Sequence, residues 1–274
     1  RYRKNVGIRN SRGLKLFLFQ LRYTKYLKLV NMDFSFGILT SSESDVYLDE
    51  IIRSIEDQKI PNYEIVLIGD TKKKFNNSNI KFIQFDESIK EGWITKKKNL
   101  ITENSKYENI VYLHDYIILG DSWYEGFKKN GNEFKVIVNK ILNIDNQRFR
   151  DWLLWPLNNN KFDQYLNRTR RCLLPYDVDN LTKYMYISGA YWVAKKSFMS
   201  KYPLNEELTW GEGEDVEWSK RIRKKTEFKF NKYSFVKFLK EKEDVYSEID
   251  ALTLEMLTSY DQSPFEIFVD KSKI

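Results

Sequence analysis

The chain has 274 residues and a formal net charge of +7, and it contains one cysteine and one histidine. These counts exclude an internal disulfide and a zinc site built from Cys and His, so acid–base chemistry falls mainly on carboxylates. The sequence contains no run of about 18 apolar residues, which is the length that a helix needs to span a bilayer. The single cysteine suits a reducing compartment, and we predict a cytoplasmic protein.

The basic charge is concentrated at the start of the chain, in residues 1–32, which contain nine Lys and Arg residues and no acidic residue. Residues 33–274 are slightly more acidic than basic. We therefore predict a basic, partly amphipathic N-terminal extension. It is either a helix with a solvated basic face or a surface that rests on anionic lipid, peripheral to the inner face of a membrane. Because the main domain has no basic stripe, we predict no nucleic-acid partner.

From Asp33 onward, apolar runs alternate with segments of helical spacing. The pattern predicts strands at 34–40, 64–68, 80–85 and 109–119, with helices at 46–58 and 95–105 between them. Strands separated by helices imply an α/β fold, with a mainly parallel sheet flanked by helices on both faces.

The second half of the chain is less regular. It predicts one or two strands within 134–144, a strand at 185–194 broken by Gly189, and helices at 214–224 and 244–257. Residues 145–183 show weak periodicity, which is typical of a long loop region that carries function.

Polar side chains follow three of the predicted strands. Thr40 and Glu43 follow the first, Asp70 follows the second, and His114 and Asp115 interrupt the fourth. Ligands of an open parallel sheet bind at the carboxyl ends of its strands, so three polar ends favour a pocket, although each residue alone could equally cap a helix or turn. Neither GxGxxG after the first strand nor GxxxxGK[ST] is present, which disfavours dinucleotide-dependent dehydrogenases and P-loop enzymes.

Residues 34–70, which include FSFGILT and LDEIIRSIEDQKIPNYEIVLIGD, resemble the opening of the family-two inverting glycosyltransferases with the GT-A fold. Ser54 and Gln58 keep that family's Ser-x-x-x-Gln helix pattern. Asp70 stands where the family recognises the nucleobase. The resemblance, which covers residues 33–225, implies a Rossmann-like GT-A domain over 33–274. It divides into a nucleotide-sugar-binding half (33–120), an acceptor-binding and catalytic half (121–225) and a C-terminal extension (226–274).

Three later segments carry the same resemblance. GWITKKKN at 92–99 is similar to the family's Gly-x-x-x-x-Arg-Asn segment, with Lys98 in place of Arg and Asn99 retained. Gly189, in ISGAYWVAKK, matches the glycine before the acceptor side of the site. WGEGEDVEWSKR at 210–221 resembles the Trp-Gly-x-Glu-Asp segment that supplies the catalytic base.

The last segment implies specific roles. Inverting transfer needs a base that takes the proton of the attacking acceptor hydroxyl, and a carboxylate at a helix N-terminus can act as that base. Asp215 is the implied base, Glu214 would orient acceptor hydroxyls, and Trp210 would offer a flat face to a sugar ring. Without the resemblance, acidic residues in a first helical turn are explained by the helix dipole alone.

The implied metal site departs from the family's pattern. YLHDYI at 112–117 lies where the family carries Asp-x-Asp, but Tyr116 replaces the second aspartate. One interpretation is that Asp115, helped by His114, holds Mg²⁺ or Mn²⁺ on the donor diphosphate. The other is a site without metal that stabilises the diphosphate through basic side chains, namely Lys97, Lys98 or Arg221.

Residues 147–155 bring together aromatic and charged residues: Arg148, Arg150, Asp151, Trp152 and Trp155. Aromatic rings flanked by charges suit a carbohydrate, so we predict that Trp152 contacts the acceptor. The alternative is that these tryptophans fill the core.

The leading hypothesis is thus a transferase that moves a sugar from a nucleotide-sugar donor to a glycan or lipid-linked acceptor, as in surface polysaccharide synthesis. A catalytically silent nucleotide- or carbohydrate-binding module of the same fold is the main alternative, supported by the missing second aspartate. A nucleotidyltransferase is less favoured, because Ser41-Ser42-Glu43-Ser44 is not a glycine-rich signature.

Overall fold

The computed structural model describes residues 32–154, 172–176, 179–252 and 254–255. The predicted basic extension therefore lies outside the described residues, apart from Met32. That residue is buried, and its backbone N–H donates to the Tyr124 hydroxyl at 3.3 Å. No helix in the described ranges has both the length and the apolar character that crossing a bilayer requires.

The described residues form a large mixed sheet of eight strands in the order β3-β2-β1-β4-β10-β6-β11-β5. Its first four strands are parallel, whereas β10 runs antiparallel to both β4 and β6. At the far edge, β11 is parallel to β6 and antiparallel to β5. The strands are β1 (Phe34–Thr40), β2 (Tyr63–Gly69), β3 (Ile80–Gln84), β4 (Asn109–His114), β5 (Ile117–Leu119), β6 (Val136–Leu142), β10 (Tyr191–Lys195) and β11 (Phe228–Phe238).

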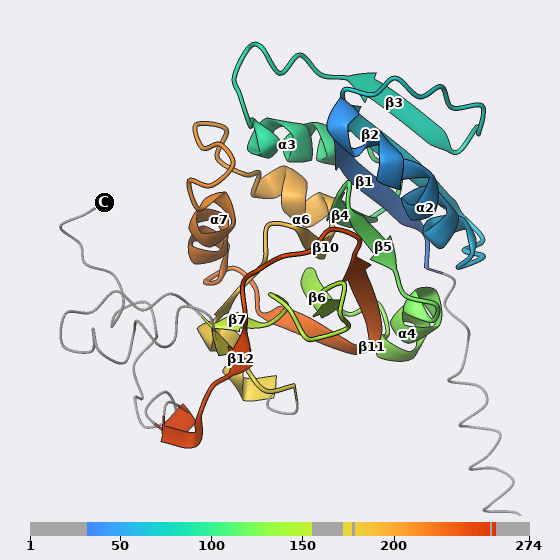
Figure 1. The fold of residues 1–274 in the computed structure, drawn as a ribbon. Coiled ribbons are helices and arrows are strands. Elements are labelled where there is room, and N and C mark those ends of the chain that lie inside the picture. The colour runs from blue at the N-terminus through green and yellow to red at the C-terminus, as the bar shows by residue number, and fades with distance from the viewer. Residues whose placement is uncertain (1–31, 155–171, 177–178, 253, 256–274) are drawn as a thin grey trace, which may run out of the picture. The chain divides into compact units, whose positions relative to one another are not determined.

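Helices cover both faces of this sheet (Figure 1). One core contains apolar side chains of α2 (Asp45–Glu56) and α4 (Trp123–Asn130), and the other contains those of α3 (Ile94–Asn104), α6 (Lys196–Lys201) and α7 (Glu214–Ile222). The helical spacing of Leu48, Ile51 and Ile55 on α2 places all three in the first core. Because β1 is covered on both faces, all seven of its residues are buried.

A second, four-stranded sheet lies in the half of the chain that the sequence left irregular. It has the order β12-β8-β7-β9 and consists of very short strands. They are β7 (Leu153–Leu154), β8 (Cys172–Leu173), β9 (Met185–Tyr186) and β12 (Ser247–Glu248), and 3-10 turns occur at η1 (Ser42–Ser44) and η2 (Asp179–Tyr184). Leu153 and Leu173 are buried, so part of the predicted loop region 145–183 belongs to the core.

Two of the predicted elements differ from the structure, the strand 109–119 and the helix 244–257. The predicted strand 109–119 is two strands separated by a turn at Asp115 and Tyr116, since β4 pairs with β1 whereas β5 pairs with β11. The break predicted at Gly189 within 185–194 is confirmed, and its two parts belong to different sheets, β9 to the small sheet and β10 to the large one. The predicted helix 244–257 begins too early, because residues 247–248 form β12 and described helical residues start at 251. Helices α4 and α6 and strand β11 were not predicted.

Candidate active site

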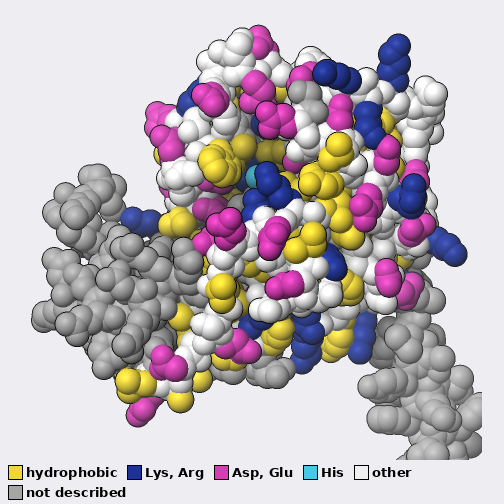
Figure 2. Space-filling model, viewed as in Figure 1, with side chains coloured by type: hydrophobic (Ala, Val, Ile, Leu, Met, Phe, Trp, Pro, Cys, Tyr) yellow, Lys and Arg dark blue, Asp and Glu magenta, His cyan; other side chains and the backbone are white. Residues whose placement is uncertain are grey.

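A cavity of about 230 Å³ lies beside the carboxyl end of β4, where β10 and α7 begin. Figure 2 shows a hollow in which the chain's one histidine is visible beside Lys or Arg and apolar side chains. The lining residues are His114, Tyr116, Arg150, Gly189, Ala190, Trp210, Gly211, Gly213, Glu214 and Asp215.

The acidic wall of the cavity is the first turn of α7. Gly213 precedes the helix with φ +75°, a left-handed conformation that glycine adopts without strain. Asp215 is buried, and its two carboxylate oxygens accept hydrogen bonds from the backbone N–H groups of Gly189 and Val216, each at 2.8 Å. These bonds fix the orientation of the carboxylate at the cavity wall.

Gly189 allows β10 to begin close to this wall. A Cβ at this position would lie 2.8 Å from Glu214 Oε1 and 3.1 Å from Asp215 Oδ2. Any larger residue would therefore push the two acidic side chains apart or out of place, which accounts for glycine between the two short strands.

Lys98 supports the acidic wall from within the core. Its side chain is completely buried, donates to the Gly189 carbonyl at 2.9 Å and lies 3.7 Å from Glu214 Oε1. Its ammonium group also lies 4.7 Å from the centre of the Trp192 ring. Burial lowers the pKa of Lys98 and raises that of Glu214, and their mutual attraction opposes both shifts.

His114, the last residue of β4, lines the same cavity. Burial, together with nearby Lys98 and Lys97, lowers the pKa of His114 well below its ordinary range, so the imidazole is neutral at physiological pH. Its Nε2 is buried without a hydrogen-bond partner among the described residues. The ring contacts Tyr116, with 5.5 Å between centroids.

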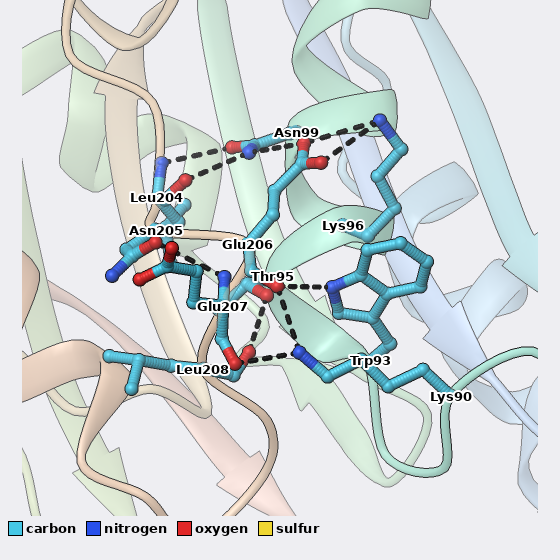
Figure 3. Close-up of polar contacts among 10 residues, drawn as sticks. All are labelled: Lys90, Trp93, Thr95, Lys96, Asn99, Leu204, Asn205, Glu206, Glu207 and Leu208. Atoms are coloured by element: carbon cyan, nitrogen blue, oxygen red, sulfur yellow. Dashed lines mark hydrogen bonds and ion pairs between the residues drawn. The ribbon is translucent and has the colours of Figure 1, made fainter.

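The exposed face of the cavity is formed by Trp210, whose side chain is 71% exposed. The loop that carries it is held against the N-terminal end of α3, as Figure 3 shows. Asn99 bonds both the N–H and the carbonyl of Leu204 at 3.0 Å, and Trp93 Nε1 donates to the Glu206 carbonyl at 2.7 Å. The Trp210 N–H then bonds the Gly92 carbonyl at 2.9 Å. Asn99 thus anchors this loop, and the role in donor binding that the resemblance implies for it stays a prediction.

The carboxyl ends of β1, β2 and β4 lie side by side, as Thr40 pairs with Gly69 and Leu39 pairs with His114. Asp70, just after β2, accepts a hydrogen bond from Gln84 Nε2 at 3.0 Å. Glu43 is exposed in the short turn η1. Neither acid lines the cavity around Asp215, so their role in donor recognition stays a prediction.

Asp115 was predicted to hold the metal, and its surroundings test that assignment. Its carboxylate accepts hydrogen bonds from the Ser41 N–H at 2.9 Å and from the hydroxyls of Ser44 and Thr40. Burial raises its pKa, and it does not line the cavity. Across the described residues, no group of three or more His, Cys, Asp or Glu side chains converges to hold a metal ion. The residues at this turn do not fit a metal site built by the protein.

Trp152 occupies a different place from the one predicted. It is completely buried, with its ring 4.5 Å from that of Phe230, so it offers no surface to an acceptor. Its neighbour Asp151 is also buried, in an ion pair with Arg148 and a hydrogen bond with Tyr176. The 147–155 segment therefore contributes mainly core, and Trp155 lies outside the described residues.

The basic residues proposed as substitutes for a metal are also engaged elsewhere. Arg221 bonds Glu217 and the Pro203 carbonyl on the exposed side of α7, and Lys97 forms an ion pair with Glu87. The cation that does line the cavity is Arg150. The sequence placed it in the aromatic and charged segment, but no motif distinguished it from its neighbours.

The structure thus gathers His114, Gly189, Trp210, Glu214 and Asp215 in one cavity. Comparison with solved structures identifies the fold. The chain is similar to a crystal structure of GalNAc-T7 with UDP, GalNAc and Mn²⁺, with a TM-score of 0.54, 16% identity, and 77% of this chain and 44% of that one covered. It is also similar to residues 1–349 of Staphylococcus aureus TarS in complex with UDP-GlcNAc, with a TM-score of 0.54, 14% identity, and 86% and 63% coverage.

These likenesses show that the chain has the GT-A glycosyltransferase fold that the sequence predicted. The matched regions span less than two thirds of either solved structure. No family model matches the chain, and no curated protein matches it by sequence.

Proposed function

We propose that this chain is an inverting glycosyltransferase that transfers a sugar from a nucleotide-sugar donor to a hydroxyl of a glycan or lipid-linked acceptor. The main support is Asp215, a carboxylate held by two backbone N–H groups at the wall of a polar cavity beside the β4 carboxyl end. Structures of the same fold contain UDP or UDP-GlcNAc. A nucleotide-sugar donor is therefore the substrate class that the fold favours.

The reaction assigns one role to each side of the cavity. The acceptor oxygen attacks the anomeric carbon, and its proton passes to the Asp215 carboxylate as the new bond forms. The bond between the anomeric carbon and the donor phosphate oxygen breaks, and its electron pair leaves with the diphosphate. Glu214 and exposed Trp210, which line the same cavity, would bind the acceptor.

A divalent metal is not assigned a step in this mechanism. GalNAc-T7 was crystallised with UDP, GalNAc and Mn²⁺. A divalent metal bound beside the donor would neutralise the charge of the diphosphate. In this chain, the Asp115 carboxylate accepts a hydrogen bond from the Ser41 N–H, just after β1, and Tyr116 supplies no carboxylate. The Mg²⁺ or Mn²⁺ predicted from the sequence therefore remains a prediction.

The assigned base is tested by a coupled assay that measures the release of UDP from each of a panel of UDP-sugars. We expect Asp215→Asn to lower kcat by a factor of about 10²–10⁴, which is what general base catalysis contributes, while UDP affinity stays within about twofold. Glu217→Gln is the matched control, because Glu217 lies on the same helical turn but pairs with Arg221.

Undiminished turnover in Asp215→Asn would remove that residue as the base. If the wild type binds UDP but transfers and hydrolyses no UDP-sugar in the panel, the silent binding module becomes the better description.

A further inference from the structure

Arg150 is a cation in the cavity wall that has no ion-pair partner within the part of the chain that the structure describes. It follows β6 and lines the cavity together with His114 and Tyr116. Among the described residues its buried Nε has no hydrogen-bond partner, and its guanidinium forms no ion pair within 4.0 Å. By contrast, its neighbour Arg148 is paired with buried Asp151.

The backbone at Arg150 has a conformation that arginine does not favour. Its φ is +45°, in the left-handed region that residues with a Cβ rarely adopt. The residues on both sides are fixed, since the Phe149 N–H bonds the Ile141 carbonyl and Asp151 is buried in its pair with Arg148. Backbone strain that the surroundings enforce is common at ligand sites, where it sets the position of a side chain.

Two cationic side chains lie near His114: Arg150, which lines the cavity, and Lys242, which does not. Lys242 lies over the Tyr116 ring, 4.6 Å from its centre, and both Lys242 and Arg150 contribute to the lowered pKa of His114. The carboxylates of Asp215 and of Glu214, which is paired with Lys98, line the same cavity. Burial alone would lower the pKa of Arg150, but nearby Tyr246, Tyr186 and Asp215 raise it above its ordinary value, so it stays charged.

We propose that Arg150 binds the diphosphate of the nucleotide-sugar donor and neutralises the charge that builds up on it as the sugar leaves. This inference rests on the proposed function and adds a second catalytic residue to it. The leaving diphosphate gains the electron pair of the broken bond, and a fixed guanidinium is suited to stabilise that charge because its donors match phosphate oxygens in pairs. His114 Nε2, which has no hydrogen-bond partner among the described residues, belongs to the same wall.

Binding measurements in the presence of EDTA test the proposal, with UDP and uridine as probes in isothermal titration calorimetry. Arg150→Gly and Arg150→Asn both remove the guanidinium, and both residues adopt a positive φ more readily than arginine. We therefore expect both variants to unfold at or above the wild-type temperature. UDP affinity should fall at least tenfold in each, while uridine affinity stays within about twofold. Arg221→Gln, which alters an arginine outside the cavity, should bind UDP as the wild type does.

Two results would overturn this inference and leave the proposed function intact. One is equal UDP affinity in the wild type and both Arg150 variants. The other is UDP binding that requires added Mn²⁺ and is insensitive to Arg150. If the wild type binds no nucleoside diphosphate at all, with or without Mn²⁺, the proposed function fails and Arg150 loses its assigned ligand as well.

Discussion

The ion pair of Lys98 and Glu214 allows a quantitative test of how the acidic wall is held. The two groups are 3.7 Å apart, and both side chains are nearly or completely buried. At an effective dielectric constant of about 20, unit charges at that separation attract each other by about 4 kcal/mol. Desolvation offsets much of this in the intact pair, but removal of one partner leaves the other charge buried and costs about 3–5 kcal/mol.

We therefore expect Lys98→Met to lower the free energy of unfolding by about 3 kcal/mol at neutral pH, or roughly 6–12 °C in Tm for a domain of this size. Lys98→Met combined with Glu214→Gln should recover about 2 kcal/mol of that loss, because no buried charge is then left unpaired. The remaining loss reflects the hydrogen bond from Lys98 to the Gly189 carbonyl, worth about 1 kcal/mol. Urea denaturation followed by tryptophan fluorescence gives all four corners of the cycle.

The contribution of Glu214 to the free energy of unfolding also depends on pH. Burial raises the pKa of Glu214 in the folded state above its ordinary value of 4.5, so the folded state retains this proton over a wider range than the unfolded chain does. The resulting stabilisation is present below pH 4.5 and is lost as pH rises through the folded pKa. Glu214→Gln should abolish this decline in stability with rising pH.

Two results of the mutant cycle would refute the reasoning. One is that the losses in free energy of unfolding simply add in the double variant, and the other is a Lys98→Met protein within about 0.5 kcal/mol of wild type.

Two further substitutions test the contacts of Asn99 and Trp152. Asn99→Ala removes both bonds to the Leu204 backbone, so we expect about 2 kcal/mol lower stability and faster hydrogen exchange over residues 204–210, whereas Asn104→Ala on the same helix should leave that loop protected. Trp152→Ala should destabilise the fold by about 3–5 kcal/mol because its ring fills the core, and exposed Trp210→Ala should change stability by less than about 0.5 kcal/mol. A Trp152→Ala protein of wild-type stability with weaker acceptor binding would favour the original assignment.

The first half of the fold was predictable because its signals are local. β1 and α2 each have an apolar pattern that the final packing preserves, and β3 and α3 lie within a residue of their predicted bounds. Strand β11 carried no comparable signal. Its burial is irregular, and a register shift between Asn231 and Phe235 interrupts its pairing with β6.

The sequence also predicted the acidic wall of the site, Glu214 and Asp215, whereas it did not predict the cation in the same cavity, Arg150. Glu214 and Asp215 lie in a contiguous motif at a helix start, and a motif of that kind retains its geometry when the chain folds. The position of Asp115 depends on the turn that separates β4 from β5. The apolar residues on both sides of His114 and Asp115 conceal that turn because together they resemble one strand.

Arg150 depends on a different kind of information. Arg150 has a positive φ between two fixed neighbours, Phe149 bonded to Ile141 and Asp151 paired with Arg148, and neither periodicity nor composition encodes that conformation. Arg148, two residues earlier, has the same side chain and forms a structural pair. What separates a structural arginine from one that faces the cavity is thus the backbone conformation at a single residue. For that reason Arg150→Gly and Arg150→Asn, which keep that conformation accessible, separate the role of the guanidinium from the role of the fold.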